Sequence, residues 1–173
     1  MSQSLLPDDI ISLARRVVEE NRAAGRKIAV AESCTGGLVA AAITEIAGSS
    51  AVLDRGFVTY SNEAKHEMLG VPCALIEAHG AVSDAVARAM AEGTLAKSTA
   101  QCAVSVTGVA GPGGGTPAKP VGMVCFGWAA IDGRPEVATR RFSGGREAVR
   151  AAAVEAALAG LIDFLERQSR PAK

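Results

Sequence analysis

Aromatic residues make up only 3% of this 173-residue chain, and its 18 basic and 18 acidic side chains leave no net charge. Proteins that bind single-stranded nucleic acid stack bases on aromatic rings, and a basic surface field attracts nucleic acid or anionic membranes. The composition therefore excludes both as expected partners and makes any anion site local. We expect a small-molecule ligand, with no nucleic acid and no membrane as partner.

Paired cysteines, metal-ligand clusters and long apolar runs are also missing. The four cysteines form no CxxC pair: Cys34, Cys73, Cys102 and Cys125. We expect buried free thiols and a reducing cytoplasm as the compartment. No His, Cys, Asp and Glu cluster has metal-ligand spacing, so no catalytic metal is expected. The longest apolar runs are too short to span a membrane, and the acidic start of the chain is unlike a signal peptide.

Helical and strand patterns alternate along the chain. Helices are predicted over residues 8–24, 36–46, 62–69, 83–96 and 147–165, and strands over 27–32, 54–60, 102–106, 122–131 and 136–142. This order predicts one domain over residues 1–173, of the α/β class. We expect a three-layer α/β/α sandwich with a mixed, mainly parallel sheet, because one hairpin interrupts the alternation.

The capping residues Asn62 and Ser83 are predicted to begin two of these helices. Ligands of such folds bind beyond the carboxyl ends of parallel strands. The loops that carry Ser33, Tyr60 and Thr107 each follow a predicted strand. We therefore expect these three loops to form the ligand site together.

The stretch AESCTGG, residues 31–37, joins a predicted strand to a predicted helix. Ser33 in such a turn suits a nucleophile, because nearby backbone N–H groups can stabilise an oxyanion. The alternative is a helix-capping hydroxyl, which spacing alone favours. Cys34 is a rival nucleophile, because the pKa of a thiol falls at a helix N-terminus. Neither His66 nor His79 stands in a motif that would pair with that thiol.

Tyr60 and Lys65 lie at the end of the next strand and in the first turns of the following helix. A neutral lysine can act as the general base for a serine, provided that burial or a nearby cation lowers its pKa from about 10.4. Tyr60 can orient or relay that proton. A solvated lysine on a helix face is the simpler interpretation of Lys65 alone.

Two later segments suit an anionic ligand. The loop from Gly108 to Pro120 is rich in glycine, so its N–H groups can approach a ligand closely, although it matches no Walker A or dinucleotide motif. Arg146 follows a pair of glycines at the start of the last predicted helix, where a guanidinium suits phosphate. A mobile surface loop and a surface charge are the respective alternatives.

Taken together, these segments resemble the CinA C-terminal domain family of nicotinamide-nucleotide amidases. The resemblance covers roughly residues 8 to 166, and its motifs stand in the family's order: AESCTGG (31–37), GFVTYSNEAK (56–65), GAVS (80–83), VTGVAGPGGG (106–115) and RFSGGREAVR (141–150). Larger members carry a further N-terminal domain that resembles molybdopterin-binding proteins. We expect this chain to represent the stand-alone form.

The resemblance implies an α/β/α fold, no cofactor, and deamidation of nicotinamide mononucleotide to nicotinic acid mononucleotide and ammonia, a step of pyridine nucleotide salvage. It implies Ser33 as nucleophile, with Tyr60 and Lys65 matching the tyrosine and lysine of TYSNEAK. Many relatives have Gly-Asp-Arg where this chain has Gly144-Gly145-Arg146, so we expect Arg146 to be held differently.

The remaining expected site residues bind substrate. Thr35, Gly36 and Gly37 are expected to supply N–H groups to the oxyanion. A second set matches the family's glycine-rich and arginine motifs and is expected to contact the ribose phosphate: Thr107, Gly108, Gly111 and Arg146.

Two other functions stay open at this point. A non-catalytic nucleotide-binding module, linked to competence or DNA damage, would keep the glycine-rich loop and Arg146 and tolerate loss of Ser33. A cysteine hydrolase would use Cys34. The alanine-rich helices also predict packing against another copy of the chain, and hence a homo-oligomer.

Overall fold

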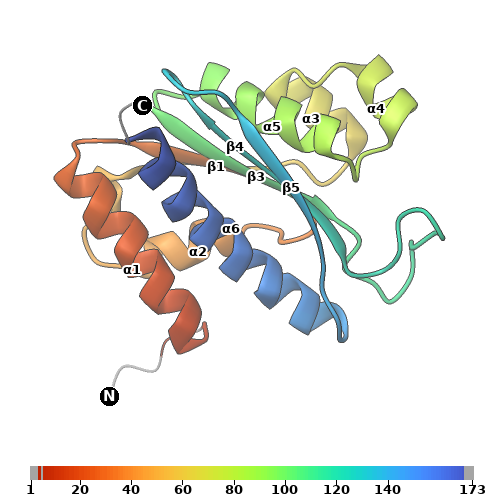
Figure 1. The fold of residues 1–173 in the computed structure, drawn as a ribbon, viewed down its shortest axis with the longest axis horizontal. Coiled ribbons are helices and arrows are strands. Elements are labelled where there is room, and N and C mark those ends of the chain that lie inside the picture. The colour runs from red at the N-terminus through yellow and green to blue at the C-terminus, as the bar shows by residue number, and fades with distance from the viewer. Residues whose placement is uncertain (1–3, 5, 170–173) are drawn as a thin grey trace.

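A five-stranded sheet lies between two layers of helices in the structure, a computed structural model that describes residues 4 and 6–169 (Figure 1). The strands are β1 (Ile28–Glu32), β2 (Leu53–Val58), β3 (Cys102–Gly108), β4 (Met123–Ala130) and β5 (Glu136–Arg141), in the spatial order β2-β1-β3-β4-β5. Strand β1 pairs in parallel with β2 and β3, whereas β4 pairs antiparallel with β3 and β5. Of the described strands, β4 alone therefore runs against the others, which confirms the predicted mixed, mainly parallel sheet.

Three helices cover each face of the sheet (Figure 1). One layer holds α1 (Asp8–Ala23), α2 (Leu38–Thr44) and α6 (Arg146–Gln168). The other holds α3 (Asn62–Leu69), α4 (Cys73–His79) and α5 (Asp84–Ala96), of which α5 lies directly on the strands and α3 and α4 pack against α5. A short 3₁₀ helix, Ser49–Ala51, precedes β2. The three-layer α/β/α sandwich is thus confirmed.

The central strands are buried on both faces, which explains their sequences. All five residues of β1 are buried, and β3 is buried except at its last residue. Strands covered on both sides need continuous apolar runs rather than alternating ones. The larger core lies between the sheet and the layer of α1, α2 and α6, and a smaller core lies under α5.

Two predicted helix starts differ from the structure. The helix after AESCTGG begins at Leu38 rather than at position 36, because Gly36 and Gly37 have φ values of +61° and +103°, in the left-handed region that glycine tolerates. The cap of α3 is Ser61, whose hydroxyl accepts the N–H of Ala64 at 3.0 Å, so the prediction of Asn62 as the cap was wrong by one residue. Ser83 caps α5 as predicted.

The alanines of α6 are used inside the chain. Ala153, Ala156 and Ala157 are buried, and α6 packs against α1, α2 and the sheet. Their small size is thereby explained without a second subunit, and the homo-oligomer stays a prediction. Among the helices of the described part of the chain, none is long and apolar enough to cross a membrane.

Candidate active site

The carboxyl ends of β1, β2 and β3 meet at one edge of the sheet. The register places Glu32 of β1 beside Val58 of β2 and Val106 of β3, so the residues that follow these strands lie next to one another. A cavity of about 290 Å³ opens there, lined by the turn after β1, the loop after β2, the start of α3, the loop before α5 and the glycine-rich loop. The predicted site residues on its wall are Ser33, Tyr60, Lys65, Thr107, Gly108, Gly111 and Arg146.

Lys65 is the most unusual of these residues, because its long side chain is only 1% exposed. Its Nζ lies 3.2 Å from Ser33 Oγ and donates to the carbonyl oxygen of Thr59 at 2.9 Å. Leu69 is buried on the same face of α3, one turn further on. Helix α3 therefore places the Lys65 amine directly against Ser33, which is 8% exposed.

Burial lowers the pKa of Lys65 below its ordinary value of 10.5. In its neutral form, the amine can donate to the Thr59 carbonyl and present its lone pair to the Ser33 hydroxyl, which is the arrangement that a general base requires.

Cys34 is buried beside Ser33, and burial raises the pKa of its thiol to about 11. The expectation of a lowered thiol pKa at this turn was therefore wrong, because the loss of solvation outweighs the favourable charges of Arg150 and Lys65. Cys102 and Cys125 are buried as expected, whereas Cys73 is exposed.

Glu32 holds the turn that carries Ser33 to the start of α2. Its carboxylate is 1% exposed and accepts three backbone N–H groups, from Gly37 and Val39 at 3.1 Å and from Ala40 at 2.9 Å. A buried carboxylate is costly unless it is hydrogen-bonded in this way. The sequence shows a charged residue ending a buried strand, but the interpretation above gave Glu32 no role.

Arg150, on α6, holds the same turn through side-chain hydrogen bonds. Its Nε donates to the carbonyl oxygen of Cys34 and its Nη2 to that of Thr35, both at 3.1 Å. This residue ends the RFSGGREAVR motif and follows Arg146 by one helical turn, which is the signal in the sequence that both face the site. No role was predicted for it.

Tyr60 is 61% exposed, and its hydroxyl accepts from Arg146 Nη2 at 3.2 Å. Arg146 also donates through Nη1 to the carbonyl oxygen of Gly111 at 2.9 Å. The structure thus brings Tyr60, Arg146 and the glycine-rich loop together. The contacts of the Tyr60 hydroxyl are with Arg146 rather than with Lys65 or Ser33.

The expected substrate-binding residues fall into two groups. Thr107, Gly108 and Gly111 line the cavity, and the Thr107 hydroxyl donates to the carbonyl oxygen of Ala81 at 2.9 Å. Thr35, Gly36 and Gly37 lie behind the cavity wall. The N–H of Gly36 donates to the carbonyl oxygen of Ser33 at 3.0 Å, and that of Gly37 to Glu32, so neither is free for an oxyanion.

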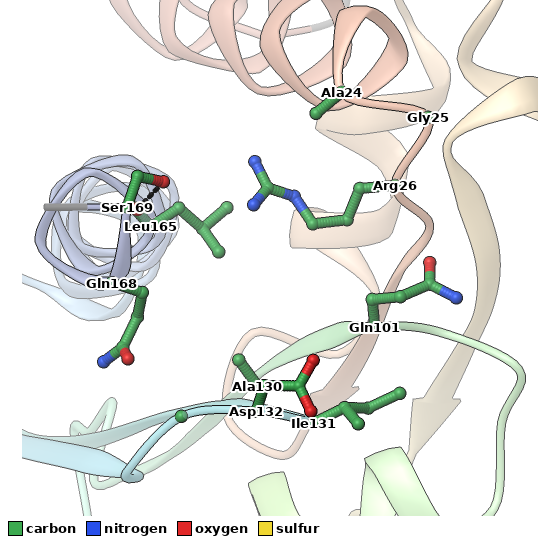
Figure 2. A pocket seen from close by; sticks show the side chains of 11 residues that line it. Ala24, Gly25, Arg26, Gln101, Ala130, Ile131, Asp132, Leu165, Gln168 and Ser169 are labelled. Carbon is green, nitrogen blue, oxygen red and sulfur yellow. Dashed lines mark hydrogen bonds between the residues drawn. The ribbon is translucent and has the colours of Figure 1, made fainter. Parts of the chain in front are cut away.

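A second cavity, of about 330 Å³, lies at the opposite end of the sheet (Figure 2). Figure 2 shows the side chains of Arg26 and Asp132 extending into the space between the end of α6 and the end of β4. Arg26 donates through Nε to Asn21 at 2.7 Å, and Asp132 is exposed. Within residues 4 and 6–169, no group of three or more His, Cys, Asp and Glu side chains is placed to hold a metal ion.

Comparison with known proteins agrees with the geometry. The family model "CinA C-terminal domain" matches residues 10–165. A protein of Enterobacter agglomerans named "Nicotinamide-nucleotide amidohydrolase PncC" is 56% identical over 146 residues, which cover 84% of this chain and 89% of that protein. A "CinA-like protein" of Mycolicibacterium gilvum is 58% identical over 127 residues, but they cover only 30% of its length against 73% of this chain.

A solved structure extends the similarity to the whole fold. The competence/damage inducible protein CihA from Agrobacterium tumefaciens is 50% identical, with a TM-score of 0.93 over 94% of this chain and 99% of that one. A CinA superfamily protein from Klebsiella pneumoniae 700603 is 40% identical, with a TM-score of 0.87 over 91% of this chain and 98% of that one. Family model, sequence and fold agree, and the chain belongs to the CinA C-terminal domain family.

Proposed function

We propose that this protein hydrolyses the carboxamide of nicotinamide mononucleotide, releasing ammonia and nicotinic acid mononucleotide, with Ser33 as nucleophile and Lys65 as general base. The observation that carries the proposal is the buried Lys65 Nζ at 3.2 Å from Ser33 Oγ. The name of the Enterobacter agglomerans relative supports the substrate. The product would return to pyridine nucleotide synthesis.

Acylation begins with transfer of the Ser33 hydroxyl proton to the lone pair of Lys65 Nζ. Ser33 Oγ bonds to the carboxamide carbon, and the carbonyl π electrons move onto oxygen to form the oxyanion. Collapse of this intermediate breaks the C–N bond, and Lys65 gives its proton to the leaving nitrogen, so that ammonia departs. The same group thus serves as base and then as acid.

Deacylation repeats these steps with water. Lys65 takes a proton from the water as its oxygen attacks the acyl carbon. The second intermediate collapses by breaking the bond to Ser33 Oγ, which recovers the proton from Lys65. The sum is one amide and one water converted to one carboxylic acid and one ammonia, so no cofactor is needed for balance.

The phosphate of the substrate is assigned to the side of the cavity formed by Arg146 and the glycine-rich loop. Arg146 uses one N–H on Gly111 and one on Tyr60, which leaves others of its five N–H groups for an anion. The positively charged pyridinium ring, placed near Lys65, would favour the neutral amine still further.

The test is an ammonia-release assay on nicotinamide mononucleotide with the wild type and Ser33→Ala. We expect the variant to lose at least about 10³-fold in kcat, as serine hydrolases do when the nucleophile is removed, while calorimetry still detects substrate binding. Ser12→Ala, on the exposed side of α1, is the matched control and should behave as the wild type. Full activity of Ser33→Ala would exclude the serine mechanism, and an inactive wild type that still binds the nucleotide would favour the non-catalytic module.

The cysteine alternative is separated by Cys34→Ala. Because its thiol stays protonated below a pKa of about 11, Cys34 supplies no thiolate near neutral pH. The variant should keep most of the activity. Hydroxylamine added to the wild type should intercept an acyl-enzyme as the hydroxamic acid, which Ser33→Ala cannot form.

A further inference from the structure

We propose that Arg150 is a positioning residue for the oxyanion hole, because it fixes the backbone around Cys34 so that the N–H of Cys34 faces the reacting carbonyl. The inference rests on the proposed acyl transfer to Ser33. It gives a role to the last arginine of the RFSGGREAVR segment and replaces Thr35, Gly36 and Gly37 as the expected donors.

Arg150 of α6 contacts the turn after β1 at two points. Arg150 projects from the second turn of α6 and is half-buried, and its guanidinium donates to two successive carbonyl groups, of Cys34 and Thr35, at 3.1 Å each. A guanidinium presents parallel N–H groups in a fixed plane, so both carbonyl groups are oriented at once. Lys65 approaches the same turn from the other helical layer.

Orienting a carbonyl also orients an N–H. In a planar trans peptide unit the C=O and the following N–H point in opposite directions. The Ser33 carbonyl accepts the N–H of Gly36 at 3.0 Å, so the N–H of Cys34 points away from that bond. Arg150 holds the carbonyl on the other side of Cys34, so both peptide planes that flank this residue are fixed.

The N–H of Cys34 is the free donor of the turn on the cavity wall. Among the described residues, no other residue accepts a hydrogen bond from it, whereas the N–H groups of Ser33, Gly36 and Gly37 are engaged by Val106, Ser33 and Glu32. Cys34 lines the cavity directly after the nucleophile. The N–H of the residue after a serine nucleophile is a recurrent oxyanion donor in hydrolases with a strand–turn–helix nucleophile.

An oxyanion donor acts on the transition state and little on the bound substrate, so kcat and KM separate its role from a binding role. The pair of variants is Arg150→Lys, which keeps the charge but loses the planar fork, and Arg150→Ala, which removes both. We expect kcat to fall about 10²-fold in each, the loss typical of one misplaced oxyanion donor, with KM within about twofold of the wild type.

Chemical rescue distinguishes orientation from mere support of the fold. Guanidinium ion at a millimolar, non-denaturing concentration should restore part of the kcat of Arg150→Ala, whereas methylammonium should not, because it lacks the paired N–H groups. Arg88→Ala is the matched control: this exposed arginine of α5 forms an ion pair with Glu92 along its own helix, and neither the kcat of the variant nor its response to guanidinium should differ from the wild type.

Several results would overturn the proposal: unchanged kcat in both variants, a raised KM with kcat unchanged, no rescue by guanidinium, or failure of both variants to fold in a thermal melt. Failure of the proposed function is a separate result. In that case the wild type itself releases no ammonia, whereas here the wild type is active and only the Arg150 series departs from expectation.

Discussion

The two ends of the sheet carry cavities of similar size, about 290 Å³ at the carboxyl end and about 330 Å³ at the amino end, yet they differ in how charge is held. At the carboxyl end, Lys65 and Glu32 are each 1% exposed and are bonded to backbone groups. At the amino end, Asp132 is exposed to solvent and Arg26 is half-buried (Figure 2).

The difference shows that volume does not identify the site. Burial of an ionisable group is unfavourable unless hydrogen bonds replace its lost water, so the carboxyl end has to supply specific partners for Lys65 and Glu32. Strained or costly arrangements of this kind concentrate at functional sites. None of the described residues that line the amino-end cavity is a buried ionisable group, so this cavity is a surface depression between helix ends.

The largest expected effect concerns Lys65. We expect Lys65→Met to reduce ammonia release at least about 10³-fold, because no other described group contacts Ser33 Oγ as a base. Lys65→Arg should not restore activity, because a guanidinium stays protonated. In the wild type, activity should rise with pH and level off below the ordinary lysine pKa, because burial lowers the pKa of Lys65.

The stability of the fold should also rise with pH over this range. Because the pKa of Lys65 is lower in the folded than in the unfolded chain, the unfolded chain binds the proton more readily, and the wild type gains stability as pH rises through the folded pKa toward 10.5. Lys65→Met lacks this penalty, so its advantage in urea unfolding should be greatest at low pH and shrink toward pH 10.5. A Met variant that is less stable at every pH would contradict this account of the site.

A smaller effect, on the free energy of unfolding, is expected when a buried hydrogen-bond acceptor, Glu32, is compared with a surface one, Gln101. Glu32→Gln places an amide NH₂ against backbone N–H donors that now meet a carboxylate, and we expect a loss of about 1–3 kcal/mol in the free energy of unfolding. Gln101→Ala is its counterpart at the amino end, where the side chain accepts the N–H of Lys27 and donates to the carbonyl oxygen of Thr99, both at exposed positions. We expect that change to cost less than about 1 kcal/mol.

Equal losses in the two variants would remove the distinction between the ends. Urea unfolding at pH 7 measures both, and an unchanged dependence on urea concentration shows that the folded states are comparable.

The sequence predicts the carboxyl-end site because its parts are local. Apolar runs give β1 and β3, the β-favouring residues from Phe57 give the end of β2, and Ser33, Tyr60 and Thr107 each lie within two residues of a strand end. Once the strands are parallel neighbours, their ends must meet. The pairing of Ser33 with Lys65 then follows from the position of Lys65 one turn into the helix after β2.

What the sequence does not predict depends on contacts across the fold. Arg150 reaches Cys34 from 116 positions away, and no local pattern encodes a contact between layers. The engagement of Gly37 by Glu32 depends on which way a buried carboxylate turns. The depth to which Lys65 is buried is likewise set by packing, since a lysine in a helical pattern ordinarily indicates a solvated face.

The smallest expected effect tests the amino-end cavity itself. Asp132→Asn removes the exposed carboxylate at the turn after β4, and we expect the free energy of unfolding to change by less than about 0.5 kcal/mol and kcat and KM to stay at wild-type values. The reason is that Asp132 forms no ion pair or side-chain hydrogen bond within the described part of the chain. A fall in kcat in the ammonia-release assay would show instead that the two ends are coupled through β3 and β4, and the contrast between a costly end and a neutral end would then be wrong.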